Sequence, residues 1–134
     1  MIQFTVPGNP VGKGRPRLSK WGVYTPKETV QYEKLVLLSY LGSQCRAYMD
    51  SKEPLQMSLQ IYMSIPKSAT KKQHQDAMSG VLKPVKRPDI DNIAKCIMDA
   101  LNGNAYHDDN QIIEIHCCKA YSDEPRVCVN ISLA

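Results

Sequence analysis

The chain has 134 residues, of which 43% are hydrophobic and 22% charged, which predicts one globular domain over residues 1–134 and excludes extensive intrinsic disorder. The longest apolar run, Leu35–Leu38, is too short to cross a membrane. The net charge of +4 is unevenly spread, because residues 1–87 hold 14 Lys and Arg against 5 Asp and Glu, whereas residues 88–134 hold 3 against 8. Unless the fold mixes the two regions, this asymmetry suits a protein that grips a polyanion and also holds a cation.

The first half of the chain predicts two strands separated by a helix. Apolar residues alternate over Ile2–Val6 and again, without a break, over Leu55–Ile65. Between them, Thr25–Glu28 has the pattern of a capping box with proline at the first helical position. The helix that follows is predicted to bury one apolar stripe, made of Val30, Leu37, Leu38, Leu41, Cys45 and Tyr48.

Two further helices are predicted downstream. Ser68 can cap a short polar helix over Ala69–Met78, and Gly80 is expected to end it. A longer helix is predicted over Ile90–Leu101, where apolar residues recur at helical spacing. Gly103 stands near the C-terminal end of this second helix, where glycine is common.

The end of the chain predicts two more strands. Apolar residues alternate over Ile113–Cys117 and over Val127–Leu133. The turn-rich link Ser122–Pro125 predicts that these two strands form an antiparallel hairpin. Taken together, the order of elements predicts an α+β fold with a small mixed β-sheet and helices mainly on one face.

The five cysteines are an odd number and include no Cys-x-x-Cys pair. The first residues lack the basic and apolar regions of a secretory signal, so we expect reduced thiols in a cytoplasmic protein. The segment His116–Cys118 offers three metal-ligand residue types, but neighbouring residues of a strand point to opposite faces of a sheet. A structural zinc site is therefore not expected.

Carboxylates gather around the second downstream helix. Asp89 stands where it can cap that helix. Asp91, Lys95 and Asp99 follow at i, i+4 and i+8, on the face opposite the apolar residues. The pair Asp108–Asp109 lies in the next loop, which needs only to fold back along the helix to meet the first group. Grouped carboxylates repel one another and call for a cation, and oxygen ligands favour Mg²⁺, with Mn²⁺ as a possible substitute.

Each of these residues also has an ordinary structural explanation. An aspartate at a helix start is usually a cap. Asp91 with Lys95 can be a solvated ion pair worth about 0.2–0.5 kcal/mol. Asp108–Asp109 can be turn residues. The spacing alone therefore leaves both a metal site and common helix and turn chemistry open.

A glycine-rich basic loop occupies residues 7–22 and contains four glycines. Glycine permits close backbone approach to a ligand, and cations suit phosphate oxygens. Trp21 and Tyr24 can stack on a base or a sugar. The loop lacks the ending of a phosphate-binding P-loop, and a mobile surface loop is the alternative interpretation. A second basic run, Lys83–Arg87, directly precedes the acidic segment, as a site that cuts phosphodiesters requires.

Three blocks of the sequence occur in order and at suitable spacing: Arg87–Lys95, Asp99–Gly103 and Asp108–Ile112. They match the patterns D-x-D-N-x-x-K, D-A-L and D-D-x-Q-[IV]. Together they resemble the RusA family of Holliday junction resolvases, and the start of the chain, Pro7–Arg17, looks like the phage and prophage branch of that family. The resemblance covers almost the whole chain, and the combined blocks are specific although each alone is weak.

The resemblance implies a homodimeric, Mg²⁺-dependent endonuclease that binds four-way DNA junctions and nicks two strands symmetrically, in DNA recombination and repair. It implies no organic cofactor and no membrane. Asp89, Asp91 and Asp109 match the family's metal-binding catalytic aspartates, Lys95 matches its catalytic lysine, and Asp108 matches an auxiliary acidic position. The predicted DNA contacts are seven cations of the two basic segments: Lys13, Arg15, Arg17, Lys20, Lys83, Lys86 and Arg87.

Three other functions stay open. A non-catalytic, structure-selective DNA-binding protein that retains a vestigial acidic site would bind junctions without nicking them. A metal-dependent phosphohydrolase of nucleotides is disfavoured by the missing P-loop and by the two basic segments. A structural phage protein would not need all three acidic blocks.

Overall fold

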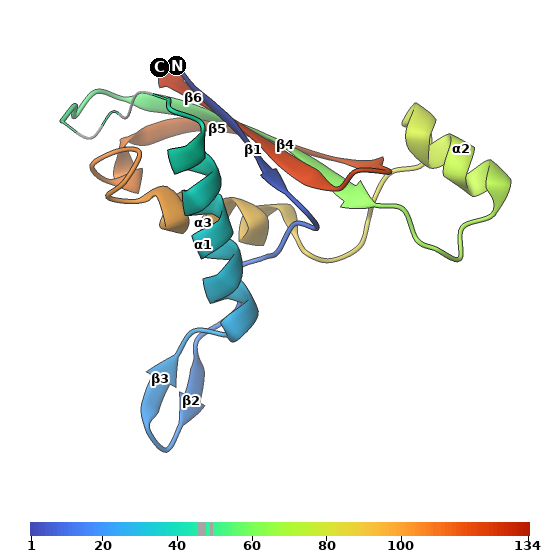
Figure 1. The fold of residues 1–134 in the computed structure, drawn as a ribbon, viewed down its shortest axis with the longest axis horizontal. Coiled ribbons are helices and arrows are strands. Elements are labelled where there is room, and N and C mark those ends of the chain that lie inside the picture. Colours follow the sequence, from blue (N-terminus) through green and yellow to red (C-terminus); the bar gives the residue numbers. More distant parts are fainter. Residues whose placement is uncertain (46–47, 49) are drawn as a thin grey trace.

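The computed structural model describes residues 1–45, 48 and 50–134. A four-stranded sheet forms one layer, and the helices α1 and α3 cross one of its faces (Figure 1). No helix of the described residues is long and apolar enough to cross a membrane. In chain order the elements are β1 (Ile2–Pro7), β2 (Arg17–Ser19), β3 (Gly22–Tyr24), α1 (Lys27–Gly42), β4 (Leu55–Ser64), α2 (Lys71–Ser79), α3 (Ile90–Leu101), the 3₁₀ turn η1 (Asp109–Gln111), β5 (Ile112–Ser122) and β6 (Arg126–Leu133).

One face of the sheet carries the hydrophobic core. The inward side chains of β1, β4 and β6 alternate with outward ones, so each strand buries every second residue. Large apolar side chains of this kind each stabilise the fold by roughly 1.5–3 kcal/mol when fully buried. The predicted α+β fold, with a mixed sheet and helices mainly on one face, is confirmed. The inward residues of the three strands are Ile2, Phe4, Val6, Leu55, Met57, Leu59, Ile61, Met63, Val127, Val129 and Ile131.

The strand order is β1-β6-β4-β5, with β4 and β5 parallel and the other neighbours antiparallel. The predicted hairpin of the last two strands is therefore wrong, because β4 lies between β5 and β6. Strand β6 pairs along its length with β1 on one side and with β4 on the other, so both of its edges are occupied. Strand β5 pairs with β4 alone and forms an edge of the sheet.

The link between these strands crosses the end of β4 and is held by hydrogen bonds. The backbone N–H of Gly8 donates to the carbonyl of Pro125 at 3.1 Å. The Arg126 guanidinium donates to the carbonyl of Glu124 at 2.7 Å and to the Ser122 hydroxyl at 3.3 Å. The turn residues therefore reverse the chain direction, as the sequence indicates. The two strands that they connect are not neighbours, because β4 lies between them.

Helix α1 packs on a different stripe from the predicted one. It buries Thr29, Tyr32, Val36 and Tyr40, whereas the predicted stripe residue Leu38 is 65% exposed. The exposed residues of that stripe also include Val30 and Leu41, while Leu37, Cys45 and Tyr48 are partly buried against the core. Tyrosines take the inward positions because a ring buries more surface than an aliphatic side chain, and Tyr40 meets Phe4 edge to face at 5.8 Å.

Two predicted helix starts are also wrong. The N-cap of α1 is Pro26, without a side-chain hydrogen bond, so the capping box over Thr25–Glu28 does not form. The cap of α2 is Thr70 rather than Ser68: the Thr70 hydroxyl accepts from the Gln73 N–H, and the Gln73 side chain accepts from the Thr70 N–H. Gly80 ends α2 at a positive φ of 84°, as predicted.

Strands β2 and β3 form a hairpin that the sequence did not predict. We call Arg17–Tyr24 the arm, since it projects from the start of α1 away from the sheet (Figure 1). Its two-residue turn is Lys20-Trp21, closed by Gly22 at a φ of 116°, where only glycine is unstrained. The hairpin escaped prediction because every residue of both strands is exposed, so no alternating burial pattern marks them.

Candidate active site

Helix α3 has the predicted bounds, and its two faces differ. Ile93 and Ile97 are fully buried against the core, whereas Asp91 and Lys95 lie exposed on the opposite face. Asp89 holds the N-cap position with extended backbone, but its side chain accepts no capping hydrogen bond. The carboxylates of Asp89 and Asp91 are therefore not engaged in capping the helix and can meet a ligand.

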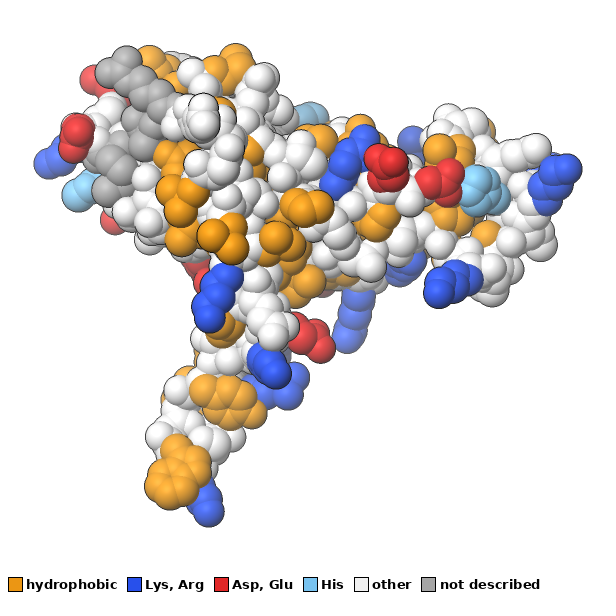
Figure 2. Space-filling view, in the orientation of Figure 1, with side chains coloured by type: hydrophobic (Ala, Val, Ile, Leu, Met, Phe, Trp, Pro, Cys, Tyr) orange, Lys and Arg blue, Asp and Glu red, His pale blue; other side chains and the backbone are white. Residues whose placement is uncertain are grey.

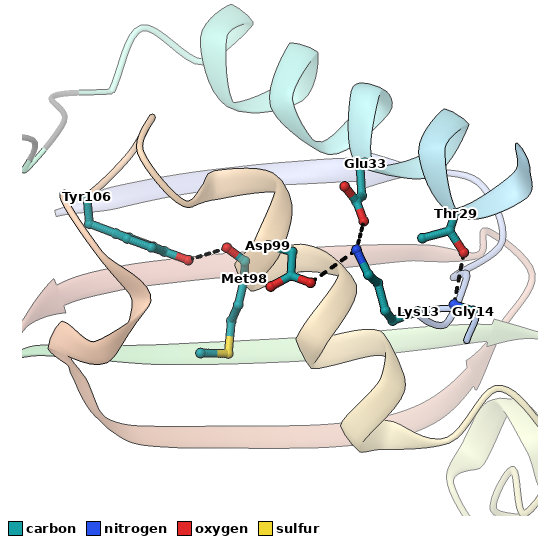
Figure 3. Close-up of polar contacts among 7 residues, drawn as sticks. All are labelled: Lys13, Gly14, Thr29, Glu33, Met98, Asp99 and Tyr106. Carbon is teal, nitrogen blue, oxygen red and sulfur yellow. Dashed lines mark hydrogen bonds and ion pairs between the residues drawn. The ribbon is translucent and has the colours of Figure 1, made fainter. Parts of the chain in front are cut away.

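The segment after α3 folds back along the helix. Tyr106 is fully buried, and its hydroxyl donates to the carbonyl of Met98 at 2.7 Å (Figure 3). Burial raises the pKa of the Tyr106 hydroxyl, which therefore stays protonated as a donor. A few residues later, the Asp109 N–H donates to the side-chain oxygen of Asn102 at 3.2 Å. These two contacts carry Asp109 back to the polar face of α3.

The turn that holds Asp109 is a capped 3₁₀ turn. The Asp108 carboxylate accepts from the Asn110 N–H at 3.0 Å, and this hydrogen bond is the main cause of the lowered pKa of Asp108. Gln111 is buried: its side-chain oxygen accepts from the Asp108 N–H, and its amide donates to the carbonyls of Ser51 and Glu53 at 3.1 and 3.0 Å. Asp108 and Gln111 thus build the turn, and Asp109 is the residue that it presents.

Asp109 lines a cavity of about 490 Å³ together with the polar face of α3. Three carboxylates and one ammonium line this acidic cavity: Asp91, Asp99, Asp109 and Lys95. Desolvation raises the pKa of Asp109, as do its contact with Asp108 and the charge of Asp99, while Lys95 acts in the opposite direction. Negative charge is therefore crowded here, and a bound cation would be favoured.

The rest of the lining of the acidic cavity is apolar. It comes from α3 and β5, whose lining side chains are Ile90, Ala94, Met98, Ile115 and Cys117. Among them, Ile90 is 37% exposed, whereas Ala94 is 8% exposed. An apolar wall lowers the local dielectric and strengthens the interaction of the carboxylates with any cation.

Asp89 faces a second and larger cavity of about 780 Å³. The charged residues that line this basic cavity are three cations, Lys13, Arg15 and Arg87, and two carboxylates, Glu28 and Asp89. Both cavities include residues of the first turn of α3, so a carboxylate-lined space and a cation-lined space meet there. A phosphate chain could lie across this meeting point.

The three predicted metal ligands do not form one cluster. Within residues 1–45, 48 and 50–134, no three acidic, His or Cys side chains lie close enough together to hold a metal ion. Asp91 and Asp109 share the acidic cavity, and Asp89 lines the basic one. This donor set still fits Mg²⁺, which is commonly held by one or two carboxylates together with waters and a substrate phosphate.

Lys13 ties the basic loop to both helices that cover the sheet. Its ammonium lies 2.5 Å from the Glu33 carboxylate on α1 and 3.1 Å from the Asp99 carboxylate on α3 (Figure 3). Partial burial would lower the pKa of Lys13, but the hydrogen bonds to Glu33 and Asp99 outweigh it and the pKa is raised. The DNA contact predicted for Lys13 stays a prediction, and its observed partners give it a structural role that the sequence did not reveal.

Two glycines of the basic loop pack against the protein itself. A Cβ on Gly12 would lie 3.0 Å from Pro88, and a Cβ on Gly14 would lie 2.7 Å from Pro26. The Gly14 N–H also donates to the Thr29 hydroxyl at 2.9 Å (Figure 3). The base of this loop is therefore anchored, and only the arm extends away from the body.

Lys119 of β5 holds the segment that leads into α3. Its ammonium donates to the carbonyl of Lys86 at 2.7 Å and to that of Pro88 at 3.0 Å. These contacts fix the backbone directly before Asp89. Sequence reasoning missed Lys119, because a single lysine in a strand carries no motif.

The remaining predicted DNA contacts lie on the surface. Arg15 and Arg87 line the basic cavity, whereas Lys86 donates to the Ser64 carbonyl at 3.1 Å and lies 5.6 Å from the centre of the Tyr121 ring. The exposed cations of the two basic segments are Arg15, Arg17, Lys20, Lys83, Lys86 and Arg87.

The fold and the two cavities define a small α+β protein that places carboxylates beside cations at one helix start, an arrangement suited to nucleic-acid phosphates. The family model described as endodeoxyribonuclease RusA matches residues 7–132. The chain therefore belongs to the RusA family, a family of nucleases that resolve Holliday junctions and bind branched DNA.

A relative from Bacillus subtilis (strain 168) shows the same full-length similarity. The protein named "Uncharacterized protein YqaN" is 39% identical over 136 residues, which cover 97% of this chain and 94% of that protein. The match thus extends over nearly the whole of both chains, including the arm, the acidic cavity and the basic cavity.

Proposed function

We propose that this protein is a Mg²⁺-dependent endonuclease that resolves four-way DNA junctions by paired, symmetric nicks. The observation that carries the proposal is the meeting of the acidic and basic cavities at the first turn of α3. Membership of the RusA family supplies the substrate class. Manganese is expected to substitute for magnesium, since both prefer oxygen ligands.

Asp91 and Asp109 would hold the metal ion in the acidic cavity, with Asp89 approaching from the neighbouring one. Bound Mg²⁺ supplies a polarised phosphate oxygen and a more acidic water for in-line attack. Lys95, one turn after Asp91 and in the same cavity, stabilises the negative charge that develops on the phosphate. Asp108 is auxiliary, because it holds the turn that presents Asp109.

The exposed cations of the two basic segments would position the DNA. Arg15 and Arg87 lie beside Asp89 and would hold the phosphates that flank the scissile one. A four-way junction offers two symmetry-related scissile phosphates, and a two-fold symmetric homodimer presents two identical sites to them. Homodimerisation is therefore part of the proposal.

The test compares nicking of a labelled four-way junction by the wild-type protein and by Asp91→Asn, with and without Mg²⁺. The expected result is paired symmetric nicks that require Mg²⁺ and are lost in Asp91→Asn. Glu114→Gln is the matched control, since it removes the charge of an exposed carboxylate that lines neither cavity. Nicking by Asp91→Asn at the wild-type rate would contradict the assigned metal site.

A non-catalytic DNA-binding protein is the second candidate function. It is favoured by one observation, the lack of a three-carboxylate cluster among the described residues. It predicts that the protein binds junctions with the same affinity in Mg²⁺ and in EDTA and produces no nicks in Mg²⁺ or Mn²⁺. The same nicking assay therefore separates the two candidates.

A further inference from the structure

The arm exposes apolar side chains that no part of the described chain covers. Trp21 at its tip is 87% exposed, and Leu18 and Val23 beside it are 83% and 66% exposed. Figure 2 shows hydrophobic side chains on the arm, clear of the body and next to cationic ones. A two-stranded ribbon of this length gains little stability by itself. Its exposed residues therefore suggest an external ligand.

The charge around the arm indicates the chemistry of that ligand. No Asp or Glu occurs before Glu28, whereas the loop and the arm carry Arg15, Arg17 and Lys20. Lys20 lies 5.1 Å from the centre of the Trp21 ring, so a cation and an indole share the tip. The arm itself carries positive charge and no acidic residue, which favours a polyanion over a second, also basic, copy of the chain.

The arm is also fixed relative to the candidate active site. Its base is held by the Gly14 hydrogen bond to Thr29 and by the ion pairs of Lys13. Arg15, two residues before the arm, lines the basic cavity next to Asp89. Strands rise about 3.3 Å per residue, so the six residue steps from Arg15 to Trp21 extend at most about 20 Å. A nucleic acid seated at the cavity would therefore meet the tip within roughly six nucleotides.

We propose that Trp21 is a stacking wedge that selects branched DNA: its indole stacks on bases that are unstacked at the branch point, while the cations of the arm hold the adjacent phosphates. A continuous duplex offers no free base face, because its bases already stack on each other. An exposed indole on a cationic ribbon suits base stacking that tolerates any sequence. This inference rests on the proposed junction substrate and assigns the selection of that substrate to one residue.

Trp21 is the only tryptophan of the chain, so it is its own probe. The wild-type protein is titrated in EDTA, where nicking is not expected, with a four-way junction or with a linear duplex of the same sequence. Tryptophan emission reports stacking, and fluorescence anisotropy of labelled DNA reports binding in the same samples. The expected result is quenched emission on the junction and unchanged emission on the bound duplex.

Variants of the arm provide the second measurement. Trp21→Ala is expected to weaken junction binding by about fivefold or more, the lower end of the range for base–aromatic stacking, while duplex binding stays the same. Trp21→Phe keeps a ring and is expected to retain most of the selectivity. Leu38→Ala is the matched control, because it shortens an exposed apolar side chain outside the arm and both cavities. Both positions are exposed, and circular dichroism checks that each variant is folded.

Four outcomes overturn the inference. Emission that stays constant while anisotropy shows a saturated junction would leave the proposed function standing and remove the wedge. Unchanged junction selectivity in Trp21→Ala would also leave the proposed function standing and remove the wedge. Emission that changes with protein concentration in the absence of DNA would place the arm against a second copy. Absence of any DNA binding would instead refute both the proposed function and the wedge.

Discussion

Lys13 shows that the contacts of a single residue can differ from those that its sequence motif suggests. It belongs to a basic loop, yet its side chain is only 20% exposed and faces the carboxylates of Glu33 and Asp99. Lys13→Met would leave these two half-buried charges without their partner. We expect the free energy of unfolding to fall by about 1.5–3 kcal/mol, the range for hydrogen bonds to charged groups. Urea denaturation measures this free energy. Lys20→Met is the control: Lys20 is exposed, so the free energy of unfolding of this variant is expected to lie within about 0.5 kcal/mol of wild type.

The same contact predicts a pH dependence. The folded protein raises the pKa of Lys13 above its ordinary value of 10.5. The folded state therefore binds the proton more tightly than the unfolded chain, so the stabilisation is complete below pH 10.5 and is lost as the pH rises through the folded pKa. The stability difference between wild type and Lys13→Met should persist at neutral pH and shrink in strong alkali. A difference that grows with rising pH would contradict the ion-pair explanation.

At the residue scale, the sequence predicted which polar residues share a helix face, but it did not predict their contact partners from distant segments. The i, i+4, i+8 spacing placed Asp91, Lys95 and Asp99 on one face of α3, and the structure has them around one cavity. Spacing along the chain says nothing about contacts between distant segments. The partner Glu33 and the positioning residue Lys119 therefore had no signal in the sequence.

At the scale of elements, the glycine at the base of the arm sets its position. Gly14 does not have a positive φ, so alanine there meets no backbone strain. Its Cβ would nevertheless lie 2.7 Å from Pro26 and 3.0 Å from the Thr29 hydroxyl. We expect Gly14→Ala to lower the free energy of unfolding by about 1–3 kcal/mol through overpacking. Because the base of the arm must shift, junction binding should weaken as well.

Gly42 provides the matched control for this prediction. A Cβ on Gly42, at the end of α1, meets nothing within 4 Å. Gly42→Ala should leave junction binding unchanged and should stabilise the helix by up to about 1 kcal/mol. Thermal unfolding and anisotropy measure both effects. Equal stability of the two variants would show that the close packing of Gly14 has no energetic consequence.

Strands with alternating apolar residues were predictable, and the arm was not. Alternation placed β1, β4 and β6, which bury every second residue, and also β5, which is only partly buried. The arm has no buried residue, and therefore no pattern. The neighbours of β5 could not be predicted, because alternation marks a strand but not the strand with which it pairs. In α1 the apolar leucines were misleading, since Tyr32 and Tyr40 take the inward positions.

At the scale of the whole molecule, the fold keeps the charge asymmetry of the sequence. The acidic cavity is built from residues 90–117, and the basic cavity brings residues 10–15 and Glu28 to the segment 87–92. Within one chain, Asp91, Lys95 and Asp109 line the acidic cavity and Asp89 lines the basic one. If each protomer of a homodimer uses its own two cavities, the dimer is needed only to pair the nicks.

This independence predicts the behaviour of mixed dimers on a supercoiled plasmid that extrudes a cruciform. Wild-type dimers should linearise the plasmid, because two nicks fall at the same junction within one binding event. Wild-type protein mixed with excess Asp91→Asn, after subunit exchange, should instead yield mainly nicked circles, because one site of each mixed dimer is inactive. Glu114→Gln in place of Asp91→Asn should leave linear plasmid as the main product.

The ratio of linear to nicked plasmid, measured on gels as the fraction of the variant rises, discriminates between the assemblies. A dimer predicts that linear product falls with the square of the wild-type fraction, since both sites must be active. Independent monomers predict that the ratio follows total wild-type concentration alone and is insensitive to added variant. Sedimentation of the same mixtures fixes the number of chains. A monomer that still produces paired nicks would refute the homodimer and require the pairing to come from the symmetry of the junction itself.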